Sequence, residues 1–597
     1  WVTPSAGEDL ESFIRSAELP KAAVESVSLQ ISRKQNAADR SRVLTSLIQV
    51  TREGALPGAA DWTHQYGDIA NTVKSDDQRV KLPLGLLWFG GSSNMDVLPR
   101  HGHGPPEQVI GGRAIIEGMD SMSARDVYTG RVIWKRTIEN LDTYGIYFDD
   151  TYTNTPLSTR YNQVHIPGAN GRGANYVATE ESVYLALEDY CEVLNAATGK
   201  TERYIRLPLK EGGAVRPRWG FIGVYGDVLL GGHDFANYSR KAGVTLEKGT
   251  TPIEDLSASD GLVAFDRHTG EILWKIAARH SFLHNGIVAG NGRIYILDKL
   301  PKSAEGKMSR RGKVKPETYR VLALDARTGK PLWESSDFVF GTWLGYSEEH
   351  DILLQAGARD RDRLADEVGQ GMLTFRGATG EVLWKDLERR YGGPCILHHD
   401  LIMTSVPSRG VSSGVFSLLD GTPHWVTNPM TGEMEPWLIQ RAYGCNTPVA
   451  GEHMLTFRSG AAGFYDLNGK SGTGNLGGFK SSCTSNLVIA NGVLNAPDYT
   501  RTCTCGYQNQ TSLALIHMPE VELWTSSQLG SKLTESQSVS RAGINFGAPG
   551  DRLSDQGTLW LEFPAKGGDS PDIGVKVQGK EARYVRHHSS MIRGDGQ

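Results

Sequence analysis

A short phrase that returns along the chain constrains the fold more than any other feature of this sequence. It joins a polar residue, two variable residues, Thr-Gly, and an apolar run that ends in Trp. Its clearest copies are Asp126-Val-Tyr-Thr-Gly-Arg-Val-Ile-Trp134, Asp266-Arg-His-Thr-Gly-Glu-Ile-Leu-Trp274, Asp325-Ala-Arg-Thr-Gly-Lys-Pro-Leu-Trp333 and Arg376-Gly-Ala-Thr-Gly-Glu-Val-Leu-Trp384, and its weaker copies are Asn195-Ala-Ala-Thr-Gly-Lys200 and Asn428-Pro-Met-Thr-Gly-Glu433. A spacing of roughly 50 to 70 residues is typical of propellers and solenoids.

Each copy has the chemistry of a β-hairpin. An alternating apolar run such as Gly261-Leu-Val-Ala-Phe-Asp266 precedes the phrase and predicts a strand. Asp or Asn then caps a tight turn with its side chain, and Gly supplies a positive φ. The second strand ends on a Trp that can wedge between neighbouring sheets. We therefore interpret the phrase as the outer hairpin of a four-stranded blade, in a fold that protects its sheet edges by radial repetition.

Two stretches carry a family resemblance. Val321-Leu-Ala-Leu-Asp-Ala-Arg-Thr-Gly-Lys-Pro-Leu-Trp333 resembles the PQQ-like (quinoprotein-type) β-propeller repeat, and Asp61-Trp-Thr-His-Gln-Tyr-Gly-Asp68 resembles the opening segment of such proteins. The resemblance covers about residues 61–525. It implies an all-β, eight-bladed propeller with four antiparallel strands per blade. Because this superfamily includes alcohol and glucose dehydrogenases, outer-membrane assembly scaffolds and many uncharacterised secreted proteins, the fold alone does not select a function.

The apolar pattern divides the 597 residues into three regions. Residues 1–60 show helical spacing at Leu10, Phe13 and Ile14 and again over 43–48, which predicts two amphipathic helices in an N-terminal extension. Residues 61–525 form the propeller, and residues 526–597 form a small β-rich tail or the start of a further module. The chain begins at Trp1, so we expect a mature or excised piece of a longer protein.

The number of blades follows from the strands expected nearest the centre. Apolar runs that start one blade each begin near Val109, Tyr176, Phe221, Gly286, Leu344, Pro394, Thr447 and Asn486. The last outer hairpin then pairs Leu513-Ala-Leu-Ile516 with Val521-Glu-Leu-Trp524, and Gly85-Leu-Leu-Trp-Phe-Gly90 supplies the strand that closes the ring. This alignment predicts eight blades, with seven as the alternative.

A ligand site is expected at the channel mouth where these strands begin, by analogy with other propellers. The positions just before the strands bring Asn, Trp and His side chains together, which suit a planar or sugar-like ligand. The candidate cofactor-binding residues are Asn175, Trp219, Asn285, Trp343, Asn446 and Arg458. His284 is the candidate catalytic base, with Tyr499 and Arg501 as catalytic neighbours. In the alternative interpretation, the asparagines cap turns and the tryptophans fill the channel.

The cysteines and one histidine cluster give further expectations. Cys445 and Cys483 precede strands, and Cys503 and Cys505 lie in a loop nearby, so disulfides over the channel are favoured over a metal site or free thiols. Cys191 and Cys395 fall elsewhere and are expected to be buried free thiols. His398-His399-Asp400 falls on a turn at the opposite mouth, where solvated turn histidines are the preferred interpretation over a metal cluster.

Three functions remain open at this stage. The resemblance implies a quinoprotein-like oxidoreductase that acts on an alcohol or sugar with PQQ and Ca²⁺, although the adjacent cysteine pair typical of such dehydrogenases is missing and no residue matches their catalytic Asp. His284, Tyr499 and Arg501 also suit a lyase or hydrolase that acts on an acidic glycan. The third possibility is a non-catalytic, protein-binding scaffold.

Composition narrows the partners. The net charge of −5 with both signs interspersed gives no reason to expect a nucleic-acid partner. No apolar run reaches the roughly 18 residues that a transmembrane helix needs. We expect a small-molecule or glycan ligand at the channel mouth, and protein partners through the N-terminal helices. Together with the disulfides, the resemblance implies a periplasmic or extracellular protein, of bacterial type.

Overall fold

The computed structural model describes most of the chain. The described ranges are 22–36, 39–52, 54–90, 106–118, 121–139, 169–359, 367–479, 486–497, 511–526 and 537–564, except for 211, 237, 247, 248, 408, 445 and 471, with a few single positions between them. The chain separates into two compact units, Trp1–Pro57 and Gly58–Gln597. Each unit is described by itself below.

The N-terminal unit contains a long β-hairpin where we expected helices. β1 (Ala22–Asn36) and β2 (Asp39–Arg52) pair antiparallel, with Ile31 opposite Val43 and Ser26 opposite Ile48. The prediction of a helix over 43–48 is therefore wrong. Leu10, Phe13 and Ile14, the apolar positions of the other predicted helix, lie outside the described residues. The apolar pairs at 43–44 and 47–48 have helical spacing, but the β-branched residues around them favour a strand.

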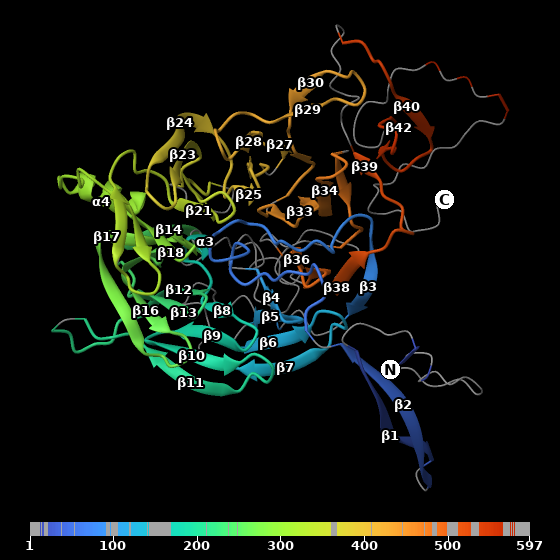
Figure 1. Ribbon diagram of the computed structural model, residues 1–597, viewed down its shortest axis with the longest axis horizontal. Helices are drawn as coiled ribbons and strands as arrows, with labels where there is room; N and C mark the ends of the chain where they lie inside the picture. Colours follow the sequence, from blue (N-terminus) through green and yellow to red (C-terminus); the bar gives the residue numbers. More distant parts are fainter. Residues whose placement is uncertain are drawn as a thin grey trace. The chain divides into compact units, whose positions relative to one another are not determined.

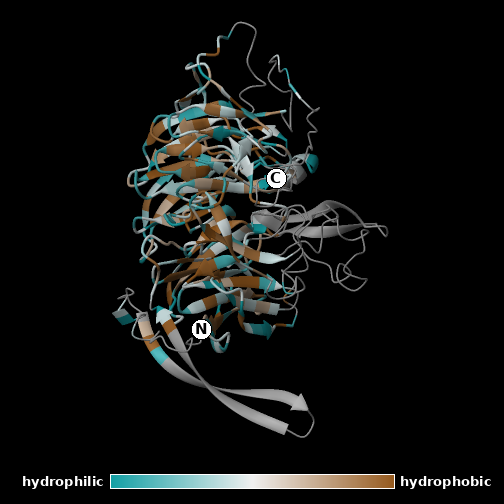
Figure 2. Ribbon diagram, turned by 90° about the vertical axis from the view of Figure 1, so that its right-hand side faces the viewer, coloured by the Kyte–Doolittle hydropathy of each residue, from teal (hydrophilic) through white to brown (hydrophobic). Residues whose placement is uncertain are grey.

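The second unit is built from antiparallel sheets that follow one another in sequence order (Figure 1). The first sheet contains β4 (Gln108–Ile110), β5 (Arg113–Gly118), β6 (Ser121–Asp126) and β7 (Val132–Thr137). The second contains β8 (Tyr176–Ala178), β9 (Ser182–Leu187), β10 (Tyr190–Asn195) and β11 (Thr201–Arg206). Their middle strands are buried on both faces, and the hydrophobic colouring of Figure 2 is concentrated in such strands.

The third sheet has seven strands because one long strand serves two groups. Its members are β12 (Trp219–Tyr225), β13 (Val228–His233), β16 (Ala258–Asp266), β17 (Ile272–Gly290), β18 (Arg293–Asp298), β19 (Arg320–Asp325) and β20 (Pro331–Ser335). The first half of β17 pairs mainly with β16, and its last residues pair with β18. A separate hairpin, β14 (Tyr238–Leu246) with β15 (Gly249–Asp255), interrupts the connection between β13 and β16.

The next sheets are β21 (Trp343–Ser347), β22 (Ile352–Ala356), β23 (Gln370–Arg376) and β24 (Val382–Arg390), followed by β25 (Ile396–His398), β26 (Leu401–Met403) and β28 (Val415–Ser417). Two short pairs accompany the second of these sheets. They are β27 (Gly410–Val411) with β31 (Gln440–Arg441), and β29 (Trp425–Thr427) with β30 (Met434–Pro436).

The last two radial sheets include strands from distant parts of the chain. One contains β32 (Val449–Ala450), β33 (Met454–Ser459), β34 (Ala461–Asp466), β35 (Thr473–Asn475) and β39 (Thr525–Ser526). The other contains β36 (Val488–Ala490), β37 (Val493–Ala496), β38 (Ser512–His517) and β3 (Leu84–Gly90). Residues 85–90 form a strand, as predicted, and this strand pairs with β38. The predicted strand over 521–524 is wrong, because β3 occupies that edge of β38.

The C-terminal part adds a small sheet of β40 (Gly543–Phe546), β41 (Arg552–Leu553) and β42 (Leu559–Phe563), in which β40 and β42 run parallel. Two short helices, α3 (Ala169–Arg172) and α4 (Lys302–Arg310), lie in connections. In the part of the chain that the structure describes, no helix has the length and apolar character to cross a membrane.

The repeated phrase acts as a joint between consecutive sheets. In the turn after β19, Asp325 Oδ1 accepts hydrogen bonds from the backbone N–H groups of Arg327 and Thr328 and from the hydroxyl of Thr328. Gly329 follows with a φ of +67°. Trp274 packs on this turn from the preceding repeat, and its Nε1 donates to Ala326 O at 3.0 Å. The same contact recurs for Trp88, Trp134, Trp333 and Trp384, which donate to Val127, Ala196, Gly377 and Leu418.

The first strands of the sheets surround residues 60–75, which we call the central segment. Ala60 O accepts from Asn491 N beside β36, and Trp62 exchanges two backbone hydrogen bonds with Val109 of β4. Further along, the carbonyls of Ile69, Ala70, Thr72 and Val73 accept from Ala289, Tyr346, Leu397 and Ala450, in β17, β21, β25 and β32. The central segment therefore connects the first strands of most sheets through backbone hydrogen bonds.

Candidate functional site

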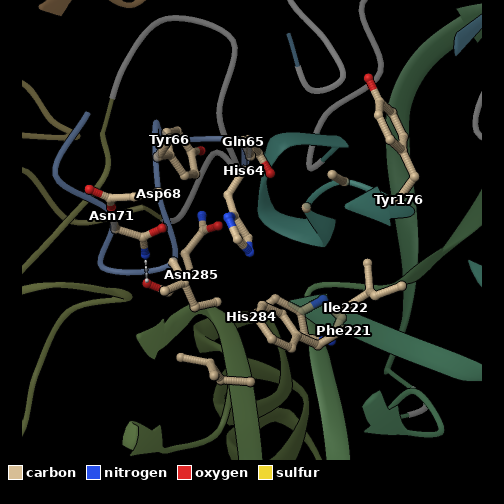
Figure 3. A pocket seen from close by; sticks show the side chains of 14 residues that line it. His64, Gln65, Tyr66, Asp68, Asn71, Tyr176, Phe221, Ile222, His284 and Asn285 are labelled. Atoms are coloured by element: carbon tan, nitrogen blue, oxygen red, sulfur yellow. Dashed lines mark hydrogen bonds between the residues drawn. The ribbon is translucent and has the colours of Figure 1, made fainter. Parts of the chain in front are cut away.

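Two cavities lie beside the central segment, and Asp68 and Ile69 line both of them. The cavity near the beginnings of the first strands has a volume of about 30 Å³, room for roughly one or two water molecules. Figure 3 shows His64, Asp68 and Asn71 of the central segment facing Phe221 of β12 and His284 and Asn285 of β17. This is the mouth at which the sequence predicts the ligand site.

His284 is held there by two hydrogen bonds. Its Nδ1 lies 2.6 Å from Arg172 O, and its Nε2 lies 2.8 Å from Ser259 Oγ. Since a carbonyl only accepts, Nδ1 carries the proton and Nε2 accepts from the serine hydroxyl. Burial lowers the pKa of His284 to about 3. The imidazole is therefore neutral, and its pKa is far from the neutral range that suits a general base; the catalytic role of His284 stays a prediction.

The two candidate tryptophans belong to the core. Trp343 is completely buried, and its ring meets the ring of Tyr66 edge-on, with centroids 4.5 Å apart. Trp219 is equally buried and stacks on Phe265 at 5.6 Å. Since the adjacent cavity holds only one or two water molecules while drug-sized ligands occupy roughly 300 Å³ or more, these residues do not fit a tricyclic quinone.

The remaining candidates make internal hydrogen bonds. Asn175 Nδ2 donates to Glu117 Oε1 at 2.9 Å, and the backbone oxygen of Asn285 accepts from Asn71 Nδ2 at 3.3 Å. Asn446 Oδ1 accepts from Arg458 N at 2.8 Å. All three asparagines are buried, and Arg458 is buried against a tyrosine ring. Each of these residues makes a contact within the protein, and its role in ligand binding stays a prediction.

Some predictions fall outside the described residues. Tyr499, Arg501, Cys445, Cys483, Cys503 and Cys505 are among those positions. The expectation for Cys191 and Cys395 is confirmed, because both are buried free thiols. Among the described residues, no group of three or more His, Cys, Asp and Glu side chains is arranged to hold a metal ion.

The larger cavity lies at the other end of the first strands. Its volume is about 500 Å³, and its walls combine the central segment and the residues after it with the turns that follow β21, β25 and β32. His399 lies on one of these turns, as predicted, with a φ of +53°. It is not merely solvated, because Nδ1 lies 3.0 Å from Glu349 Oε2 and Nε2 lies 2.7 Å from Glu452 Oε1. Lys74 Nζ lies 2.7 Å from the other oxygen of Glu452.

We call Lys74, Glu349, His399 and Glu452 the charged clasp, since they join the central segment to three sheets. The hydrogen bonds that His399 donates to Glu452 and Glu349 raise its pKa. Burial alone would raise the pKa of Glu452, but Lys74 and His399 lower it to about 2. The sequence interpretation missed three of these four residues; the signal available was the acidic turn Ser347-Glu-Glu-His-Asp351 directly after a first strand.

The fold thus defines an all-β protein whose sheets are joined by a repeated Asp-x-x-Thr-Gly turn and a tryptophan. Residues 229–386 match the family described as outer membrane protein assembly factor BamB, so the chain carries PQQ-like repeats and the predicted resemblance is confirmed. No curated protein matches the chain.

Several solved structures are similar to this chain at low sequence identity. BamB from Moraxella catarrhalis is 14% identical, with a TM-score of 0.38 over 74% of this chain and 99% of that chain. Europium-containing methanol dehydrogenase is 11% identical, with a TM-score of 0.41 over 73% and 88%. Quinohemoprotein alcohol dehydrogenase ADHIIG from Pseudomonas putida HK5 is 12% identical, with a TM-score of 0.43 over 79% and 81%.

Proposed function

We propose that this chain is a non-catalytic propeller that serves as a binding scaffold. The observation that carries the proposal is the central segment, whose backbone hydrogen bonds to successive first strands use the space in which a propeller would hold a large cofactor. Tyr66 covers Trp343, and the remaining cavity at that end measures about 30 Å³. The matched family is an assembly factor by its description, which favours a scaffold over an oxidoreductase.

We infer eight blades for this scaffold. If the seven-stranded sheet is divided within β17, the described residues of the second unit form eight radial sheets. Seven of the eight predicted starts lie within about two residues of the start of a strand, and the eighth, Gly286, lies inside β17. Contacts between β4 and both β8 and β36 support a closed ring. We also propose a periplasmic or extracellular location, on the basis of the repeat family.

A titration with PQQ and Ca²⁺ tests the proposal. We expect no saturable change in the absorption of the quinone or in tryptophan fluorescence, because Trp343 offers no free face. The matched variant is Trp343→Phe, which should behave like the parent protein in this titration. Saturable quinone binding that is lost in Trp343→Ala, with the fold retained by circular dichroism, would refute the scaffold proposal and restore the oxidoreductase.

A further inference from the structure

The cavity of about 500 Å³ beside the charged clasp has the size of a small-molecule site, since such sites occupy roughly 300 to 1,000 Å³. It is formed by parts of the chain far apart in sequence: the central segment with the residues that follow it, the ends of β17 and β21, and the turns after β25 and β32. The carbonyls of Ile69, Ala70 and Thr72 accept backbone hydrogen bonds from neighbouring strands, which fixes the floor of the cavity. The cavity is therefore a built feature of the fold.

Its lining is strongly acidic. The carboxyl groups are those of Asp68, Asp76, Glu348, Glu349 and Glu452, and the basic groups are Lys74 and His399. These two bases are already engaged: Lys74 contacts Asp76 and Glu452, and His399 contacts Glu349 and Glu452.

Two carboxylates are left without a cation among the described residues. Asp68 accepts hydrogen bonds from the hydroxyl and backbone N–H of Thr72, at 2.6 and 3.1 Å, and from the backbone of Ala70, none of which is a cation. Glu348 accepts from Asn291 N at 2.9 Å. Burial raises the pKa of Asp68 to about 6, as expected for a carboxyl that lacks a compensating positive charge. A bound cation would supply that charge.

The walls also favour an organic cation over a bare metal ion. Tyr225 and Tyr346 line the cavity together with Ile69 and Leu397. Aromatic faces attract ammonium groups, and apolar side chains pack against the methylene groups between them. The volume is also far larger than a metal ion requires.

We propose that this cavity binds an organic ammonium compound, either a free polyamine or a lysine-rich peptide segment, with Asp68 and Glu348 as its carboxylate partners. The inference rests on the proposed scaffold function, because it assigns a ligand to a binding protein. Asp68 is half-buried, so its charge pairing is weakened by salt less than pairing at an open surface. The half-buried ring of Tyr225 adds a contact for the ligand's methylene stem.

Isothermal titration calorimetry with spermidine and with trilysine peptide, on the full chain, tests the proposal. We expect saturable binding of at least one probe, and an affinity at least about tenfold lower in Glu348→Gln, which corresponds to about 1.4 kcal/mol. Asp68→Asn should have the same effect. Glu381→Gln, which changes an exposed glutamate outside the cavity, should leave the affinity unchanged.

The outcomes separate the sources of the ligand. Binding of spermidine alone supports a free polyamine, binding of trilysine alone supports a peptide, and binding of both supports recognition of the ammonium group itself. No binding of either probe, or binding that both cavity variants leave unchanged, overturns the inference. The quinone titration above tests the scaffold function by a different probe, so either proposal can fail without the other.

Discussion

The joint between neighbouring sheets makes a sharp prediction at Gly329. A Cβ atom at this position would lie 2.6 Å from Cδ2 and Cγ of Trp274, and the backbone φ of +67° is unfavourable for any residue with a side chain. Gly292 is the matched control, because its φ is +74° and its Cβ would meet no atom within 4 Å. Replacement of each glycine by alanine separates the backbone cost from the collision with the indole.

The backbone cost is common to both variants. A left-handed conformation costs an alanine about 1–2 kcal/mol, and the more restricted unfolded chain returns about 0.4–1 kcal/mol. We therefore expect Gly292→Ala to lower the free energy of unfolding by about 1 kcal/mol. In Gly329→Ala the indole must also shift, which costs about 1–3 kcal/mol for overpacking.

That shift also weakens the hydrogen bond from Trp274 to Ala326 O, which contributes about 1 kcal/mol. We expect a total loss of about 3 kcal/mol for Gly329→Ala, measured by urea denaturation with circular dichroism. When Gly329→Ala is introduced into the Trp274→Ala variant, it should lower the free energy of unfolding by only as much as Gly292→Ala does in the parent protein. The packing of Trp274 on this turn would be refuted if both glycine variants lowered the free energy of unfolding equally. It would also be refuted if Gly329→Ala cost as much in the Trp274→Ala background as in the parent protein.

Three further predictions concern the central segment, the charged clasp and the two buried thiols. Tyr66→Ala removes a buried ring from beside a tryptophan and should cost about 3–5 kcal/mol in thermal or urea unfolding, whereas Tyr66→Phe should cost less than 1.5 kcal/mol. Because the pKa of His399 is raised in the folded protein, its stabilisation is complete below its unfolded pKa and is lost as the pH rises through the folded value. His399 is 45% exposed, so the stability gap between the parent protein and His399→Gln should shrink by only about 1 kcal/mol or less from pH 6 to pH 9; a gap that widens would contradict the ion pairs. Burial raises the thiol pKa values of Cys191 and Cys395, so neither should react with a thiol reagent until the protein unfolds, and rapid labelling of the native protein at either position would be inconsistent with the structure.

Much of the fold could be predicted because its information is local and repeated. The Asp-x-x-Thr-Gly turn needs a capping carboxylate and a positive φ within five residues, and the sequence contains this motif several times. The tryptophan contact adds one long-range rule that each copy repeats. The N-terminal hairpin was missed for the opposite reason: over 43–48 the apolar residues have helical spacing, and no repeated motif indicates that this segment pairs as a strand.

The site was harder to predict because the central segment has no repeat. Alignment of the first strands predicts that Trp343 and His284 lie near one end of the centre, but nothing in that alignment shows that Tyr66 packs against the tryptophan. Likewise, Asp68 and Glu348 are 280 positions apart, and they line one cavity only because the central segment passes the ends of β17 and β21.

The central segment thereby changes which end of a propeller can function. At the beginnings of the first strands, the backbone of the central segment is hydrogen-bonded to the strands, and the rings of Tyr66 and Trp343 pack together. His284 is held neutral there between a carbonyl and a serine hydroxyl. At their ends, the short turns project acidic side chains past the segment, and the cavity they enclose is more than tenfold larger. A segment that passes through the centre leaves little room at the beginnings of the strands, yet it provides a floor against which the turns can hold charges. Binding chemistry is therefore expected at the acidic end.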